Sequence, residues 1–158
     1  DCAGSARRPT AALGINQGMP RTTETIEIAA RAARVFEVIA TPERWSEGYL
    51  ETRLRSPDYP RPDSRNDHVY RTRIRENVAA RVISCEPPRL LEEAQRGRTF
   101  SRRVRYRLEP AGEGTRLTVE DEISFLGLAV LAAPLAVRDV RARWQRSLER
   151  LRESAERR

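Results

Sequence analysis

The hydrophobic period changes along the sequence, and this change limits the possible folds more than any other feature. Residues 22–30, TTETIEIAA, alternate apolar and charged side chains as a half-buried strand does. Six further segments between residues 51 and 125 favour strands, most of them by the same alternation, and short turns link several of them. From Val137 to Ala155, apolar side chains instead recur every three or four residues. This part predicts one long amphipathic helix that begins near Pro134.

Two short helices are predicted after the first strand. Residues 32–40 carry apolar side chains at spacings of three and four. Thr41 and Pro42 then form a helix start signal, with the threonine as N-cap and the proline in the first turn. We expect this second helix to end near Gly48.

The order of these elements predicts how they pack. A sheet with one apolar face must be covered, and the C-terminal helix carries the only long apolar stripe. The sequence therefore predicts an α+β fold in which a seven-stranded antiparallel sheet wraps around the long C-terminal helix. Because a curved sheet and two short helices leave space at one end, we also expect a cavity for a small molecule.

The length of 158 residues suits one domain. We expect this domain to span residues 22–158 and residues 1–21 to be a disordered leader or a cloning remnant. Cys2 and Cys85 are too few and too far apart for a disulfide framework or a metal site, which fits a reducing cytoplasm. The longest apolar stretch, residues 125–137, contains a proline and falls short of the roughly 18 residues of a membrane span. These features predict a soluble protein that does not insert into membranes.

The net charge of +7 would normally suggest nucleic acid as a partner. However, all 30 basic residues are arginines, and they are dispersed among 23 acidic residues. A GC-rich genome produces this bias without any binding role, so the charge does not favour a nucleic-acid partner.

Four segments carry a resemblance to a known family. They are IEIAARAARVFEVIATPERW (residues 26–45), CEPPRLL (85–91), YRLEPAGEGTRLTVE (106–120) and SLERLRESAE (147–156). Together they resemble the START-like (SRPBCC) superfamily, especially its polyketide cyclase/dehydrase-type bacterial members. The resemblance implies the helix-grip fold with an elongated cavity for an apolar or amphipathic ligand. It does not imply one activity, so function must be argued from the site.

Five aromatic residues are candidates for the cavity wall. Tyr70 and Tyr106 point inward by strand alternation, and Trp144 lies on the inner stripe of the long helix. Trp45 and Tyr49 lie on or just after the second short helix, where the resembled family places one end of its cavity. Packing in an ordinary core remains an alternative for these residues.

Asp121 breaks the apolar alternation of its strand, and Arg102 breaks that of the strand before it. Two hairpin registers bring them together. In one they are direct partners, and in the other Val104 opposes Asp121 and Arg102 lies on the diagonal. The two residues can form a polar anchor for a ligand or a purely structural ion pair, or a bulge can expose Asp121 instead.

His68 is the only histidine and the first candidate for acid/base chemistry at neutral pH, either at the cavity mouth or in solvent. We expect Cys85 to be a structural thiol without a catalytic role. We find no sequence motif for a metal or cofactor and therefore expect neither.

The leading hypothesis is a module that binds a small hydrophobic or amphipathic molecule. One alternative is a cofactor-independent cyclase or dehydratase in which Asp121, Arg102 and His68 are the catalytic candidates. Another is an interaction protein without a ligand, which would have a closed cavity and an exposed apolar patch. The sequence leaves a homodimer open.

Overall fold

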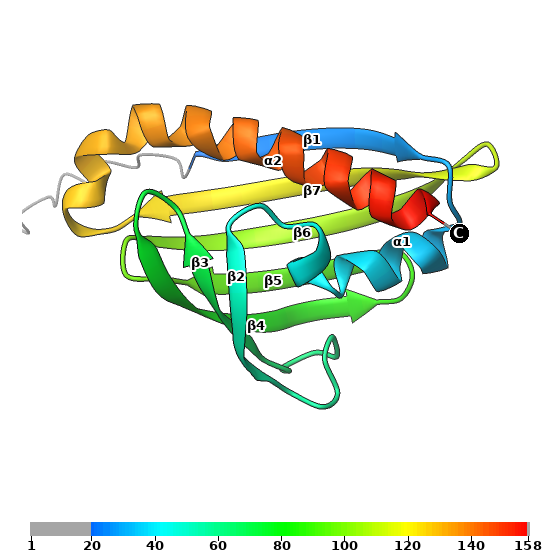
Figure 1. Cartoon of the computed structure of the whole chain (residues 1–158), viewed down its shortest axis with the longest axis horizontal. Coiled ribbons are helices and arrows are strands. Elements are labelled where there is room, and N and C mark those ends of the chain that lie inside the picture. The colour runs from blue at the N-terminus through cyan, green and yellow to red at the C-terminus, as the bar shows by residue number, and fades with distance from the viewer. Residues whose placement is uncertain (1–19, 158) are drawn as a thin grey trace, which may run out of the picture.

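A computed structural model describes residues 20–157 of the chain (Figure 1). The expectations for a leader over residues 1–21 and for Cys2 fall almost wholly outside this range. The strands are β1 (Arg21–Ile28), β2 (Tyr49–Arg55), β3 (Asn66–Arg71), β4 (Arg75–Glu86), β5 (Leu90–Arg96), β6 (Phe100–Ala111) and β7 (Gly114–Phe125). The helices are α1 (Ala32–Ile39), the 3₁₀ turns η1 (Pro42–Arg44) and η2 (Gly127–Ala132), and α2 (Ala133–Glu156).

The seven strands form one antiparallel sheet in the order β1-β7-β6-β5-β4-β3-β2. Strands β2 to β7 follow one another as a meander, and β1 closes the order by pairing with β7. The sheet curves beneath α2, which runs along its concave side, and α1 lies near the far end of α2 (Figure 1). The predicted α+β helix-grip architecture is confirmed.

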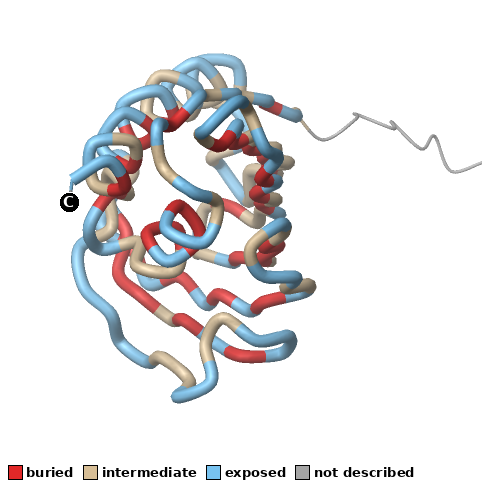
Figure 2. Tube along the Cα trace, turned by 90° about the vertical axis from the view of Figure 1, so that its right-hand side faces the viewer, coloured by how far each residue is buried: buried red, intermediate tan, exposed pale blue. Residues whose placement is uncertain are grey.

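Strand alternation and the helix stripe supply the core. Buried and exposed residues alternate along the long strands, as Figure 2 shows from the end where α1 lies. From α2 the buried side chains include Trp144, Leu148 and Leu151, at the spacing predicted from the sequence. Burial of these apolar groups is what holds the helix against the sheet.

The β6–β7 hairpin takes the second of the two predicted registers. Val104 lies opposite Asp121, and Arg102 lies opposite Ile123. No register shift interrupts this pair of strands, and Asp121 is 0% exposed. The bulge that would have exposed Asp121 is therefore absent from the hairpin, and Arg102 reaches it along the diagonal.

Two local predictions were wrong. The second short helix is only the 3₁₀ turn η1, because the Thr41 hydroxyl donates back to the Glu37 carbonyl at 2.7 Å and does not cap a new helix. The chain then turns into β2 at Gly48, whose φ of 96° suits glycine.

The segment HVYRTRIRE (residues 68–76), one of the six further segments whose pattern favours a single strand, is the other error. It turns at residues 72–74, where the Thr72 amide donates to the Ile74 carbonyl at 2.9 Å. Alternation continues through so short a turn, so the sequence pattern did not reveal it.

Candidate functional site

A cavity of about 270 Å³ lies between the concave face of the sheet and α2. This volume is just below the roughly 300–1,000 Å³ typical of small-molecule sites. Its apolar lining includes Ile39, Leu91, Ile123, Phe125 and Val140. Exposed residues such as Arg73 and Asp139 also belong to the lining, which places an opening near the β3–β4 turn and the start of α2.

Seven of the eight residues predicted for the site line this cavity. They are Trp45, Tyr49, His68, Tyr70, Arg102, Tyr106 and Trp144. Asp121 is the exception, since it is fully buried and does not belong to the lining. The structure thus places the carboxylate behind the wall, where it contacts wall residues.

Three aromatic rings form one part of the wall. Trp45 and Trp144 stack with centroids 6.2 Å apart and an interplanar angle of 29°. The ring of Tyr106 stands edge-on to each of them, 6.1 Å away. Offset and edge-on contacts of this kind stabilise aromatic clusters, so the wall is held in one arrangement.

Arg102 is a cationic group of the wall, with a side chain that is only 9% exposed. Its Nε donates to Gln95 Oε1 at 2.9 Å, and its Nη1 lies 3.7 Å from Asp121 Oδ2. The guanidinium carbon also lies 5.4 Å from the centroid of Tyr70 and 5.8 Å from that of Trp144. Burial alone would lower the pKa of Arg102, but Asp121 and the neighbouring tyrosines raise it, so the guanidinium stays charged.

Asp121 lies behind the cavity wall and pairs with Arg102. Its Oδ2 accepts a 2.7 Å hydrogen bond from Trp144 Nε1 and faces Arg102, which forms the ion pair predicted from the sequence. Burial raises the pKa of Asp121, while Arg102 and Trp144 oppose that shift. One carboxylate oxygen thus joins β6, β7 and α2.

Glu93 is a second buried carboxylate beside the cavity, and it was not predicted from the sequence. Tyr59 donates to its Oε1 at 2.8 Å, and the Gln95 amide donates to its Oε2 at 3.0 Å. Burial raises the pKa of Glu93, while the hydrogen bonds from Tyr59 and Gln95 oppose the shift. Alternation in LLEEAQRG would have revealed Glu93 and Gln95, because both share a face with the buried Leu91.

These contacts join into one polar chain along the cavity. Arg102 donates to Gln95, Gln95 donates to Glu93, and Tyr59 donates to Glu93 from the other side. Each bond in this chain points toward Glu93, so its carboxylate acts purely as an acceptor. The orientation of Arg102 therefore depends on residues of β5 and of the loop between β2 and β3.

His68 is buried beside this chain. Its ring stacks on Tyr49 with centroids 4.6 Å apart, and its Nδ1 lies 2.8 Å from the Asn66 carbonyl oxygen. Because a carbonyl only accepts, Nδ1 must carry the proton. Burial lowers the pKa of His68 to about 4, so the ring is neutral at pH 7 and Nε2 is an unprotonated acceptor.

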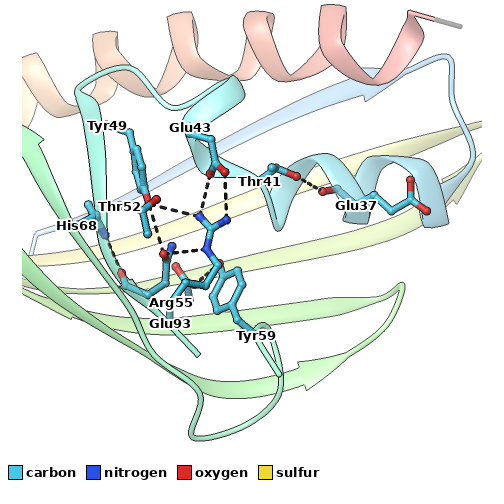
Figure 3. A network of polar contacts seen from close by, with 10 residues as sticks. Glu37, Thr41, Glu43, Tyr49, Thr52, Arg55, Tyr59, His68 and Glu93 are labelled. Carbon is cyan, nitrogen blue, oxygen red and sulfur yellow. Dashed lines mark hydrogen bonds and ion pairs between the residues drawn. The ribbon is translucent and has the colours of Figure 1, made fainter. Parts of the chain in front are cut away.

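A network centred on Arg55 lies next to η1 and includes three residues of the cavity lining, Tyr49, Tyr59 and Asn66 (Figure 3). Its two terminal nitrogens contact both oxygens of Glu43, at 3.0 and 2.9 Å, and its Nε donates to Asn66 Oδ1 at 3.1 Å. The guanidinium also lies over the ring of Tyr59, 5.4 Å from its centroid. Arg55 thus fixes η1 to β2 and β3, and nothing in the sequence pattern singled it out.

Within the described residues, no group of three or more histidine, cysteine or acidic residues could hold a metal ion. Over the same residues, no helix is both long and apolar enough to cross a membrane.

A curved antiparallel sheet, a long C-terminal helix and a partly polar cavity between them define the helix-grip class of START-like proteins. A family model described as "Polyketide cyclase / dehydrase and lipid transport" matches residues 19–156. The chain belongs to this family.

Solved structures support the same fold. A protein from Chromobacterium violaceum superimposes with a TM-score of 0.69 at 16% identity, covering 87% of this chain and 99% of that one. A START superfamily protein from Mycobacterium smegmatis gives 0.64 at 16% identity, with coverage of 82% and 94%. The di-domain ARO/CYC BexL from the BE-7585A biosynthetic pathway gives 0.66 at 17% identity, with coverage of 87% and 50%. No curated protein matches the sequence.

Proposed function

We propose that the protein binds a small amphipathic molecule whose anionic or strongly polar end meets Arg102. The observation that carries this proposal is the Arg102 guanidinium in the wall of a largely apolar cavity, on a side chain that is only 9% exposed. Gln95 and Asp121 hold that guanidinium without covering it, since it remains part of the lining. A charge kept in such a place favours a ligand group that accepts hydrogen bonds.

The apolar part of the ligand would lie along Ile123, Phe125 and Val140. The cavity volume of about 270 Å³ favours a compact molecule over a long lipid. The neutral Nε2 of His68 offers an acceptor for a hydroxyl group of the same ligand. For the compartment we propose the cytoplasm, because Cys85 is a free thiol.

Tryptophan fluorescence provides a direct test. The chain has two tryptophans, and both line the cavity. We expect 8-anilinonaphthalene-1-sulfonate to quench their emission saturably, with one probe bound per chain. The uncharged analogue N-phenyl-1-naphthylamine should bind at the same place, since it shares the aromatic body without the sulfonate.

Two variants identify the site. Arg102→Gln should weaken binding of the sulfonate probe at least about tenfold and leave binding of the uncharged probe within about twofold of the wild type. Arg103→Gln is the matched control, because Arg103 is next in β6 and its side chain is 51% exposed. Val140→Trp should fill the cavity and weaken both probes, whereas Gln145→Trp, on the exposed side of α2, should not. Normal binding by Val140→Trp would contradict the proposal.

A cofactor-independent cyclase or dehydratase reaction is a second candidate, and the state of His68 favours it. A neutral imidazole with one bare nitrogen in a cavity can act as a general base. Arg102 could stabilise an oxyanion that develops on the substrate. Once a substrate is found, His68→Gln should lower kcat much more than it changes KM, and an unchanged kcat would exclude this role.

A further inference from the structure

Exposed apolar side chains gather at one end of the molecule, in the segment that joins β7 to α2 and in the first turn of α2. Leu128 is 86% exposed, Leu131 is 83% exposed and Leu135 is 63% exposed. Val130 lies among them and is 49% exposed. Large apolar groups so close together and so open to solvent usually mark an interaction surface. We call Leu128, Val130, Leu131 and Leu135 the apolar tip.

In this segment the small residues face inward and the large apolar residues face solvent, which is the reverse of an ordinary amphipathic element. Ala129, Ala132 and Ala136 line the cavity, while the larger residues of the apolar tip face solvent. Folding alone would favour the opposite arrangement, because burial of leucine is worth more than burial of alanine. The leucines therefore contribute little to the stability of the fold.

Two neighbouring turns hold the tip in place. The Leu126 amide donates to the Thr99 carbonyl at 2.8 Å, which ties the segment to the β5–β6 turn. Arg73 in the β3–β4 turn lies 3.1 Å from Asp139 at the start of α2. In Figure 1 these turns and the start of α2 lie at the same end of the molecule.

Positive charge surrounds the apolar tip. Residues 71–76, 97–100 and 126–139 contain five exposed arginines and two acidic residues. The arginines are Arg71, Arg73, Arg75, Arg98 and Arg138. Asp139 pairs with Arg73, and Arg75 lies 3.4 Å from Glu51 of β2, while Glu76 is 6% exposed and accepts from the Arg98 and Thr99 amides. Among the described residues, Arg71, Arg98 and Arg138 form no ion pair. The end of the molecule that carries the tip is therefore apolar at its centre and cationic at its edge.

We propose that the apolar tip docks onto the surface of an anionic lipid bilayer. Apolar side chains that reach the acyl boundary, surrounded by arginines at headgroup level, suit such a surface. A second copy of this chain is a poorer partner, because its own arginines would face these ones. The cavity opens beside the tip, so docking brings the opening to the bilayer.

Vesicle co-sedimentation of the full chain tests the proposal. We expect binding to vesicles of three parts phosphatidylcholine to one part phosphatidylglycerol, and at least about tenfold weaker binding to phosphatidylcholine alone. Replacing Leu128, Leu131 and Leu135 by serine should weaken binding to the anionic vesicles at least about tenfold. The matched control replaces Leu54 of β2 and Ile83 of β4 by serine, since these residues are 47% and 43% exposed but lie outside the apolar tip. It should bind within about twofold of the wild type.

The arginines are tested separately from the leucines. Arg98→Gln with Arg138→Gln should weaken binding to anionic vesicles several-fold, whereas Arg107→Gln with Arg150→Gln should not, because these arginines lie elsewhere. Probe quenching of tryptophan should survive in the triple serine variant, which shows that it is folded.

Three outcomes would overturn the proposal. They are a wild type that binds neither kind of vesicle, a triple serine variant that binds like the wild type, and a dimer that depends on the three leucines without any vesicle binding. Hydrogen exchange supplies an independent readout, since residues 127–136 should become protected only when anionic vesicles are present.

Discussion

Trp144 Nε1, in the middle of α2, donates a 2.7 Å hydrogen bond to Asp121 Oδ2 in β7. Both residues are buried, Trp144 at 6% and Asp121 at 0% exposure. A residue that breaks the apolar pattern of β7 is thus the acceptor that fixes the position of an aromatic residue on the helix. The same oxygen lies 3.7 Å from Arg102, so helix position and guanidinium position are linked.

Trp144→Phe should lower the free energy of unfolding by about 1–3 kcal/mol, because a buried carboxylate loses its neutral donor. Urea unfolding at pH 7, followed by circular dichroism, measures the change. Gln145→Phe on the exposed side of the same helix should shift stability by no more than about 0.5 kcal/mol. An equally small effect for Trp144→Phe would show that the hydrogen bond adds nothing.

Gln95→Met should weaken binding of the sulfonate probe about three- to tenfold and leave the uncharged probe nearly unchanged. Gln95 accepts from Arg102 Nε at 2.9 Å, so its loss lets the guanidinium turn away from the ligand. A purely structural role would weaken both probes alike, and tryptophan quenching distinguishes the two results. The variant should also be less stable, because Glu93 loses one donor.

His68 should make the protein less stable as the pH falls. In the folded chain its pKa is lowered to about 4 from 6.5, so the unfolded chain binds the additional proton between these values. Stability is therefore fully present above pH 6.5 and is lost toward pH 4, by up to about 3 kcal/mol. His68→Phe keeps a ring against Tyr49 and should remove this part of the pH dependence.

The difference in unfolding free energy between wild type and His68→Phe is the quantity to measure, at pH 7.5 and at pH 4.5. Acidic residues titrate in both proteins, so their contributions cancel in the difference. A difference that stays constant over this range would mean that His68 does not titrate between the folded and unfolded states.

Glu43→Gln should cost about 1 kcal/mol, because it breaks the two-point contact between Arg55 and the carboxylate. The pKa of Glu43 is lowered mainly by its hydrogen bond from Arg55, which shows the direction of the effect. Both side chains are partly exposed, so solvent limits the loss. Glu37→Gln is the comparison and should cost less, since Glu37 is more exposed and its single contact with Arg34 is longer, at 3.4 Å. Thermal unfolding of the two variants should separate them by a few degrees.

Local pattern was enough to predict most of the elements. Alternation identified most of the seven strands and the helix stripe identified α2, because these patterns depend on which side chains face the core. The prediction failed where a single local hydrogen bond decided the outcome, because the pattern of apolar residues does not reveal such bonds. The hydroxyl of Thr41 bonds back to α1, and the chain reverses at residues 72–74 without breaking the alternation of apolar residues.

The site was predictable only in part, for a similar reason. Asp121 and Arg102 stood out because each is a charge in an otherwise apolar row. Glu93 and Gln95 alternate with the buried Leu91, but their strand is rich in polar residues, so they contrast less with their neighbours than Asp121 and Arg102 do. Arg55 is one of many arginines, and only its contacts distinguish it.

The sequence by itself determined which residues face inward along most strands and along α2, and with them a sheet wrapped around the C-terminal helix. It predicted an inward Asp121 paired with Arg102, with a bulge that exposes Asp121 as the alternative. These predictions follow from periodicity, which is a local property of the chain. Only the tertiary structure decided that Asp121 is buried behind the cavity wall, that Glu93 terminates the polar chain, and that the leucines around the start of α2 face solvent. Those facts depend on distances between strands, turns and helix that are far apart in the chain, and periodicity carries no information about such distances.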